Sequence, residues 1–165
     1  MDGFDLFAYE QNYRDGQCVL REDRSTIVLF ETDDAYGKQV IPDAPEMVCT
    51  QYMYDPESLD LTSEGQFLKD HYIQIGLWKQ YDAYGEVVEE QDMDKGFPVK
   101  WAELKGILLA NGNRLEDIQQ LSRFYGEDKR PVWLAVMKTV QGVRETLLVD
   151  AVSGEVIQHE SKRLK

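Results

Sequence analysis

Carboxylates concentrated between Glu89 and Asp94 are the residues whose types and spacing come closest to a chemical site. Two neighbouring carboxyl groups can act as general acid and general base, but that chemistry needs burial that raises one pKa. Here Glu89, Glu90, Asp92 and Asp94 occupy a strand-like run and the turn that follows it, and nothing flanking them suggests a pocket. The pattern therefore predicts a solvated acidic face rather than a catalytic pair.

Metal binding is the second chemistry that this stretch suggests. The run from Asp92 to Gly96 (DMDKG) is similar to the start of a calcium loop, but its glycine is the fifth residue and an EF-hand loop needs glycine at the sixth. Histidine and cysteine offer no alternative, because His71 and His159 do not lie at ligand spacing to a cysteine. We expect no metal site.

Other catalytic signatures are also missing from the sequence. It contains no GxGxxG, no P-loop and no GxSxG. The two cysteines, Cys18 and Cys49, lie in separate strand-like segments, which favours two buried reduced thiols. We predict that the chain is not an enzyme and uses no cofactor.

Charge divides the sequence into two parts. Through Pro98 there are 22 acidic and 7 basic residues, a net charge of −15, whereas from Val99 onward 9 acidic and 11 basic residues give +2. Carboxylates beside phosphates repel, so the acidic part argues against nucleic acid and against anionic membranes. It favours a cationic protein partner, but a charge excess alone is more often only a well-solvated, soluble surface.

Two elements of the C-terminal part are predicted from pattern alone. Pro131–Glu160 alternates apolar and polar residues and breaks at Gln141-Gly142 and at Ser153-Gly154, which is typical of a three-stranded antiparallel meander. Upstream, the apolar spacing of Trp101–Asn111 and of Arg114–Tyr125 predicts two short helices that cover the meander. The fold class expected from these elements is α+β.

The acidic N-terminal part is predicted to be β-rich. Strand-like runs are expected at Gln17–Arg21, Ser25–Glu31, Lys38–Ile41, Met47–Tyr54, Tyr72–Tyr81 and Glu86–Gln91. Met1–Gly16 is either a short helix or an irregular lead-in. We place the domain boundary at Pro98, which gives an acidic β-rich part at 1–98 and a helix-helix-meander part at 99–165. The length suits one domain or two small subdomains that share a core.

One hairpin resembles a known repeat. Gly76, Trp78, Tyr81 and Gly85 follow the Gly-x-Trp-x-x-Tyr pattern of a strand that turns through a glycine into the next strand. This unit resembles the MORN-type and related antitoxin-like β-hairpin, and it occurs here in a single copy. Read physically, Gly76 permits a close backbone approach, and Trp78 and Tyr81 cap the face of the hairpin.

The ending of the meander resembles a second family. Asp150, Ala151, Gly154, Glu155 and Val156 match the Asp-Ala-x-x-Gly-x-Val/Ile turn and strand of PepSY-type domains, over roughly 99–160. The resemblance implies a non-enzymatic domain, in some cases linked to peptidase inhibition. The residues themselves favour a structural role, in which Asp150 accepts hydrogen bonds from the turn and Gly154 supplies a positive φ.

Two functions remain open from the sequence. The first is an acidic immunity or antitoxin-type protein that occludes a basic toxin or effector domain, and the second is an envelope-associated PepSY-like regulator or peptidase inhibitor. The acidic start of the chain lacks the features of a secretory signal, which favours the first and a cytoplasmic location, or a periplasmic one if a signal has been removed. The partner-binding residues expected for the first function lie on the hairpin and just beyond it: Tyr84, Glu86, Glu89, Glu90, Asp92 and Asp94.

Overall fold

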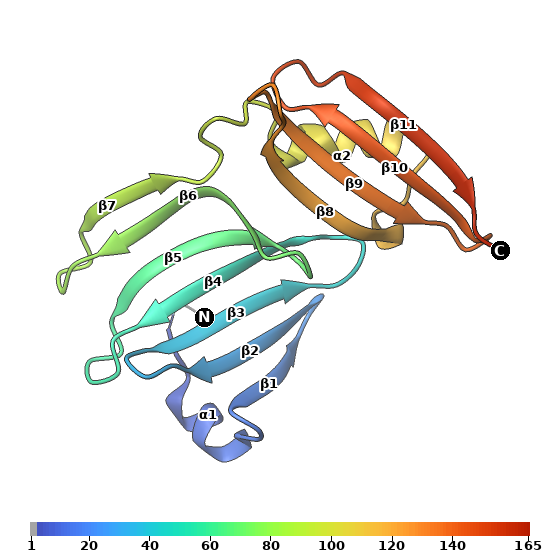
Figure 1. The fold of residues 1–165 in the computed structure, drawn as a ribbon. Helices are drawn as coiled ribbons and strands as arrows, with labels where there is room; N and C mark the ends of the chain where they lie inside the picture. The colour runs from blue at the N-terminus through green and yellow to red at the C-terminus, as the bar shows by residue number, and fades with distance from the viewer. Residues whose placement is uncertain (1–2) are drawn as a thin grey trace. The chain divides into compact units, whose positions relative to one another are not determined.

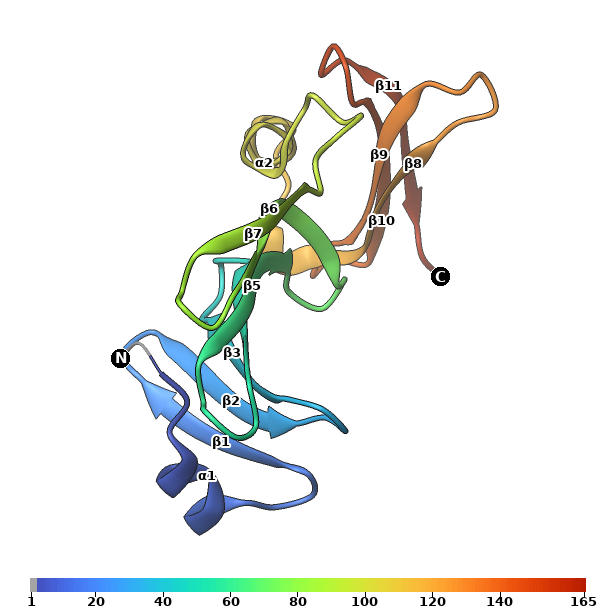
Figure 2. The same cartoon turned by 90° about the vertical axis from the view of Figure 1, so that its left-hand side faces the viewer.

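The computed structural model describes residues 3–165 and divides the chain into two compact units, Met1–Met93 and Asp94–Lys165. Figures 1 and 2 show the two units. Unit 1 contains 6 basic and 21 acidic residues, and unit 2 contains 12 basic and 10 acidic residues. The acidic excess of the protein therefore belongs to unit 1.

The predicted fold class, α+β, is wrong. The described residues form eleven strands in two antiparallel sheets, with two α-helices and one 3₁₀ turn. One of the two helices expected in the C-terminal part is a strand, and nearly all other regular structure is β. The fold is therefore β-rich. Within residues 3–165 there is no helix with the length and apolar character needed to cross a membrane.

Unit 1 is built on a seven-stranded sheet in which every strand pairs with its neighbour in sequence, in the order β1-β2-β3-β4-β5-β6-β7 (Figure 1). Short turns join the strands, as expected for an antiparallel meander. The sheet begins after helix α1 (Leu6–Asn12), which lies within the segment predicted as a helix or a lead-in; residues 1 and 2 of that segment fall outside the described part. The strands are β1 (Gln17–Glu22), β2 (Ser25–Glu31), β3 (Tyr36–Pro42), β4 (Val48–Tyr54), β5 (Leu61–Leu68), β6 (Ile73–Tyr81) and β7 (Val87–Asp92).

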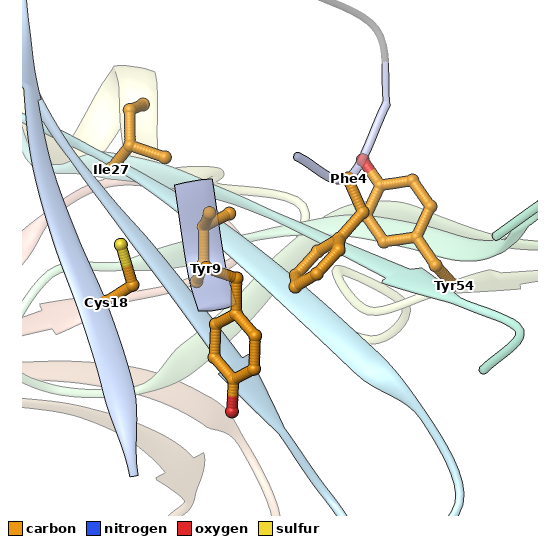
Figure 3. Packing of buried hydrophobic residues seen from close by; sticks show 6 residues of the cluster. Phe4, Tyr9, Cys18, Ile27 and Tyr54 are labelled. Atoms are coloured by element: carbon orange, nitrogen blue, oxygen red, sulfur yellow. The ribbon is translucent and has the colours of Figure 1, made fainter. Parts of the chain in front are cut away.

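The core of unit 1 lies between α1 and the first four strands. Asp5 begins the helix by accepting a hydrogen bond from the Ala8 amide at 2.9 Å. Figure 3 shows how aromatic and aliphatic side chains then meet on one face of the sheet. The ring of Phe4 lies 5.5 Å from that of Tyr9 and 5.8 Å from that of Tyr54, while Cys18 and Ile27 pack from the strands. Burial and the nearby charge of Glu31 raise the pKa of Tyr9 to about 12.

The two cysteines are free and buried, as predicted. The strand register places Cys18 opposite Leu29, Lys38 and Tyr52 in successive strands, whereas Cys49 lies three residues before Tyr52. Side chains alternate between faces along a strand, so the two thiols occupy opposite faces of the sheet. Burial raises the pKa of both thiols, that of Cys49 to about 11.

Unit 2 combines one helix with a four-stranded sheet in the order β11-β10-β9-β8. Its elements are α2 (Trp101–Ala110), the 3₁₀ turn η1 (Leu115–Asp117), β8 (Ile118–Tyr125), β9 (Pro131–Lys138), β10 (Val143–Asp150) and β11 (Val156–Arg163). The helix at Trp101 and the three-stranded meander are thus confirmed. Figures 1 and 2 show α2 against one face of this sheet. Trp133 reaches toward that side and donates a hydrogen bond from Nε1 to the Val99 carbonyl at 2.8 Å.

The helix predicted at Arg114–Tyr125 is instead η1 followed by strand β8. Ile118 pairs with Met137 and Leu121 pairs with Ala135, so a bulge at Gln119 inserts one residue between them. Met137 and Ala135 share a face of β9, and Ile118 and Leu121 therefore share the matching face of β8. The bulge gives a strand the three-residue apolar spacing that is otherwise typical of a helix.

The turn between β10 and β11 has the structure that its sequence predicted. Asp150 Oδ1 accepts hydrogen bonds from the amides of Val152 at 2.8 Å and Ser153 at 3.0 Å. Gly154 has a φ of +78°, and its amide binds the Asp150 carbonyl at 2.9 Å. Arg130 also forms an ion pair with the same carboxylate. The structural role proposed for Asp150 and Gly154 is confirmed.

Candidate functional site

The hairpin formed by β6 and β7 carries most of the residues predicted to bind a partner. Its tip is fixed by Asp82, whose Oδ1 accepts hydrogen bonds from the amides of Tyr84 and Glu86, both at 2.9 Å. Gly85 adopts a φ of +79°, and its amide binds the Asp82 carbonyl at 3.1 Å. Asp82 and Gly85 thus fix a tight turn, at which the Tyr84 side chain is exposed to solvent.

Strand β7 forms one edge of the seven-stranded sheet, and all six of its residues are exposed. Glu90 lies opposite Lys79 and Glu89 lies opposite Gln80, so the two glutamates point to different faces. Asp92 shares the face of Glu90 two residues further on. The carboxylates therefore flank the free edge on both sides and form an acidic border that a cationic surface could approach.

Apolar side chains accompany this acidic border. Tyr84 is 92% exposed at the tip, and Val88 is 62% exposed within the strand. Val87 is also exposed. Protein interfaces are enriched in aromatic residues at their centres and polar residues at their rims. We use the term acidic hairpin for Tyr84, Glu86, Val87, Val88, Glu89, Glu90 and Asp92.

Asp94 does not belong to this surface. Its carboxylate is 7% exposed and accepts a hydrogen bond from Arg123 Nη1 at 2.7 Å. The Arg123 guanidinium in turn lies 5.1 Å from the ring centre of Phe97 and 5.2 Å from that of Trp133. Asp94 is therefore a buried partner of an arginine that lies close to two aromatic rings in unit 2. Its position argues for a structural role.

The strand that supports the acidic hairpin is anchored by aromatic side chains. Tyr81 donates a hydrogen bond to Glu64 Oε1 at 2.6 Å, and this bond, followed by burial, raises the pKa of Tyr81 to about 12. Trp78 lies flat over Gly65, where an added Cβ would come within 2.0 Å of the indole, and it donates to the Gln66 carbonyl at 3.0 Å. Close approach was expected at Gly76, but it occurs at Gly65; Gly76 instead supplies a φ of +67°.

The two histidines lie in different units, His71 in unit 1 and His159 in unit 2. Burial lowers the pKa of His71 in the turn before β6, while Nε2 of His159 on β11 lies 3.9 Å from Glu145. Across residues 3–165, no group of three or more histidine, cysteine, aspartate or glutamate side chains is arranged to hold a metal ion.

Strand register also assembles a shallow groove that the sequence did not predict. It has a volume of about 430 Å³ and lies on the face of the sheet that Lys79 occupies. Lys79 sits there between two carboxylates in register, Glu64 on β5 and Glu90 on β7. The groove is lined by Thr50, Tyr52, Glu64, Gly65, Gln66, Leu77 and Lys79. Its charges alternate in sign across the strands, so the groove presents no strong field toward a ligand.

The acidic hairpin is thus the most distinctive surface of unit 1, with Tyr84, Glu86, Glu89, Glu90 and Asp92 brought together and Asp94 set apart. Exposure of Val87 and Val88 was missed, because two adjacent valines in a strand are more often buried than exposed. Comparison of the chain with protein-family models finds no match, and comparison with curated proteins finds none either.

Proposed function

We propose that the chain is a non-enzymatic binding protein of the immunity or antitoxin type, which docks a basic toxin or effector domain on its acidic hairpin and neutralises that domain by occlusion. The observation that carries the proposal is an edge strand that is exposed along its whole length, bordered by carboxylates and led by an aromatic side chain that is 92% exposed. An aromatic anchor with an acidic rim suits a partner that has a basic cleft.

Carboxylates on an edge strand have a second use, because they also prevent unwanted pairing with strands of other chains. That use accounts for Glu89 and Glu90, but it does not account for Tyr84, Val87 and Val88. Exposed apolar groups add nothing to solubility, and here all three belong to the same hairpin. The combination therefore favours a binding surface over a purely protective one.

The proposal predicts different kinetic effects for the charges and for the tyrosine. Exposed charges at the rim of an interface mainly affect the association rate, whereas a buried aromatic anchor mainly affects the dissociation rate. Association should therefore slow as salt rises, since the Debye length falls from about 10 Å at 0.1 M to about 3 Å at 1 M. Replacing Tyr84 with alanine should accelerate dissociation.

The test begins with affinity capture on the immobilised chain and identification of the bound protein by mass spectrometry. Association and dissociation rates for the purified partner are then measured for wild type, for Tyr84→Ala, and for Glu89→Lys with Glu90→Lys. Glu10→Lys with Glu57→Lys is the matched control, because both residues are exposed in unit 1 and the net charge changes equally.

We expect the Glu89 and Glu90 reversal to slow association, and the control pair to slow it less. The captured protein should also lose its own activity when the chain is bound. Equal association rates for the two double variants, or a partner that stays active in the complex, would refute the proposal.

A further inference from the structure

Three basic side chains lie in register on one face of the sheet of unit 2. Arg144 on β10 pairs directly with Lys138 on β9 and with Lys162 on β11, so the three occupy one row across neighbouring strands. All three are exposed, and within the described part of the chain none of them forms a side-chain hydrogen bond or an ion pair. We call Lys138, Arg144 and Lys162 the basic row.

The basic row is unusual within this protein. In unit 1 the corresponding cross-strand lysine, Lys79, has a glutamate opposite it on each side. In unit 2 the central cation has a cation on each side, and like charges directly opposite one another destabilise a sheet. On β11 the same face also carries Glu160, two residues before Lys162, and its carboxylate accepts a hydrogen bond from Gln158 at 2.6 Å. An acidic partner would remove the repulsion.

The row lies on the face of the sheet opposite to helix α2. Trp133 binds the Val99 carbonyl just before α2, so Trp133, Ala135 and Met137 lie on the α2 side of β9 and the alternate residues lie on the other side. Figure 2 shows no helix of unit 2 on that second side. Beside the basic row this face carries the buried Val136 paired with Thr146, and beyond them the half-buried Leu134 and Leu148, which pair with each other across β9 and β10. A row of cations beside apolar side chains suits a protein surface.

We propose that the basic row binds the acidic hairpin of a second copy of this chain. This inference rests on the function proposed for the acidic hairpin. Charge complementarity of the two surfaces supports this occupant, because the basic row carries three cations and the acidic hairpin four carboxylates. Glu90 and Asp92 lie about 7 Å apart on one face of β7, and the basic row spans about 10 Å across three strands. Flexible lysine and arginine side chains bridge that difference. Self-association then occupies the acidic hairpin until a basic partner displaces the second copy.

The experiment measures the self-association of the full chain by sedimentation velocity over a range of concentrations, at low and at high salt. One variant reverses the basic row by Lys138→Glu, Arg144→Glu and Lys162→Glu, and a second reverses the matching face of the hairpin by Glu90→Lys and Asp92→Lys. The control variant changes Lys95, Arg163 and Lys165 to glutamate. It alters net charge as the first does, and Arg163 points to the opposite face of β11 from Lys162. Circular dichroism verifies that every variant is folded.

We expect wild type to associate at low salt and to dissociate at high salt. Each reversal alone should weaken association by about tenfold or more, as loss of complementary charge pairs does. An equal mixture of the two reversed variants should associate again, since each then supplies the surface that the other lacks. The control variant should self-associate more strongly than the row variant.

A wild-type chain that stays monomeric at low salt would overturn the inference, as would a mixture that fails to associate. Binding of heparin or a single-stranded oligonucleotide to the basic row, without self-association, would overturn it in favour of a polyanion. The sedimentation experiment uses this chain alone. An absence of self-association therefore leaves the association and dissociation rates measured with a basic partner unchanged, and the proposed function can still be tested. A chain that self-associates through the row but binds no basic partner would refute the proposed function alone.

Discussion

The Arg123 guanidinium donates a hydrogen bond to the Asp94 carboxylate at 2.7 Å, and both side chains are less than a tenth exposed. The rings of Phe97 and Trp133 lie close to the same guanidinium, at 5.1 and 5.2 Å. A positive charge near aromatic faces is stabilised by their electron density, and the carboxylate neutralises it. The pair thereby fastens the segment that precedes α2 to strands β8 and β9.

Removing one member of this pair should destabilise unit 2 strongly. Asp94→Asn keeps the volume of the side chain but leaves the Arg123 charge buried without its carboxylate, which in other proteins costs roughly 3–5 kcal/mol. Chemical denaturation followed by tryptophan fluorescence measures the free energy of unfolding. Glu127→Gln, the loss of an exposed carboxylate in the same unit, should change it by no more than about 0.5 kcal/mol. A loss for Asp94→Asn as small as that of the control would show that the pair contributes little.

Asp94 also shows where sequence reasoning about the site fails. It lies two residues after the exposed Asp92 and shares its chemistry, so local pattern places both in one acidic face. The residue that distinguishes them is Arg123 on β8, 29 positions later in the sequence, so no local pattern connects it with Asp94. The basic row is hidden for the same reason, because it depends on the register of three strands.

Turns were predictable where short side chains determine the local geometry. Asp82 with Gly85, and Asp150 with Gly154, indicate the hairpins through residues that can accept amide hydrogen bonds or adopt positive φ. Strand β8 was not predictable in this way. Its bulge at Gln119 gives Ile118 and Leu121 a helical spacing, and only the register against β9 reveals that they lie on one face of a strand.

Two glycine substitutions should change stability in opposite directions. At Gly65 an added Cβ would lie 2.0 Å from Trp78 Cδ2, so Gly65→Ala must displace the indole and its hydrogen bond to Gln66. At Gly106, inside α2, an added Cβ meets nothing within 4 Å, and alanine should stabilise the helix by about 0.5–1 kcal/mol. Thermal denaturation should show a lower Tm for Gly65→Ala and a higher one for Gly106→Ala. An unchanged Tm for Gly65→Ala would mean that Trp78 moves aside at no cost.

Acid should destabilise the β10–β11 turn through Asp150. Hydrogen bonds from the amides of Ser153 and Val152, together with the nearby Arg130, hold the pKa of Asp150 below its usual value. The pKa of an aspartate in the unfolded chain is about 3.9, so the ionised carboxylate stabilises the fold above that pH. This stabilisation is lost as the pH falls from about 3.9 through the lower pKa of the folded state.

The variant Asp150→Asn isolates this contribution, because the amide keeps an oxygen acceptor but cannot titrate. Its free energy of unfolding should lie below that of wild type at pH 7, and the gap should narrow as the pH falls below about 4, because protonation then removes the same charge from wild type. Urea denaturation at pH 7, 5, 4 and 3 gives the two curves. Glu155→Gln, which removes an exposed carboxylate from the same turn, controls for net charge and should stay within about 0.5 kcal/mol of wild type at pH 7. A gap between wild type and Asp150→Asn that stays constant down to pH 3 would show that ionisation of Asp150 does not stabilise the turn.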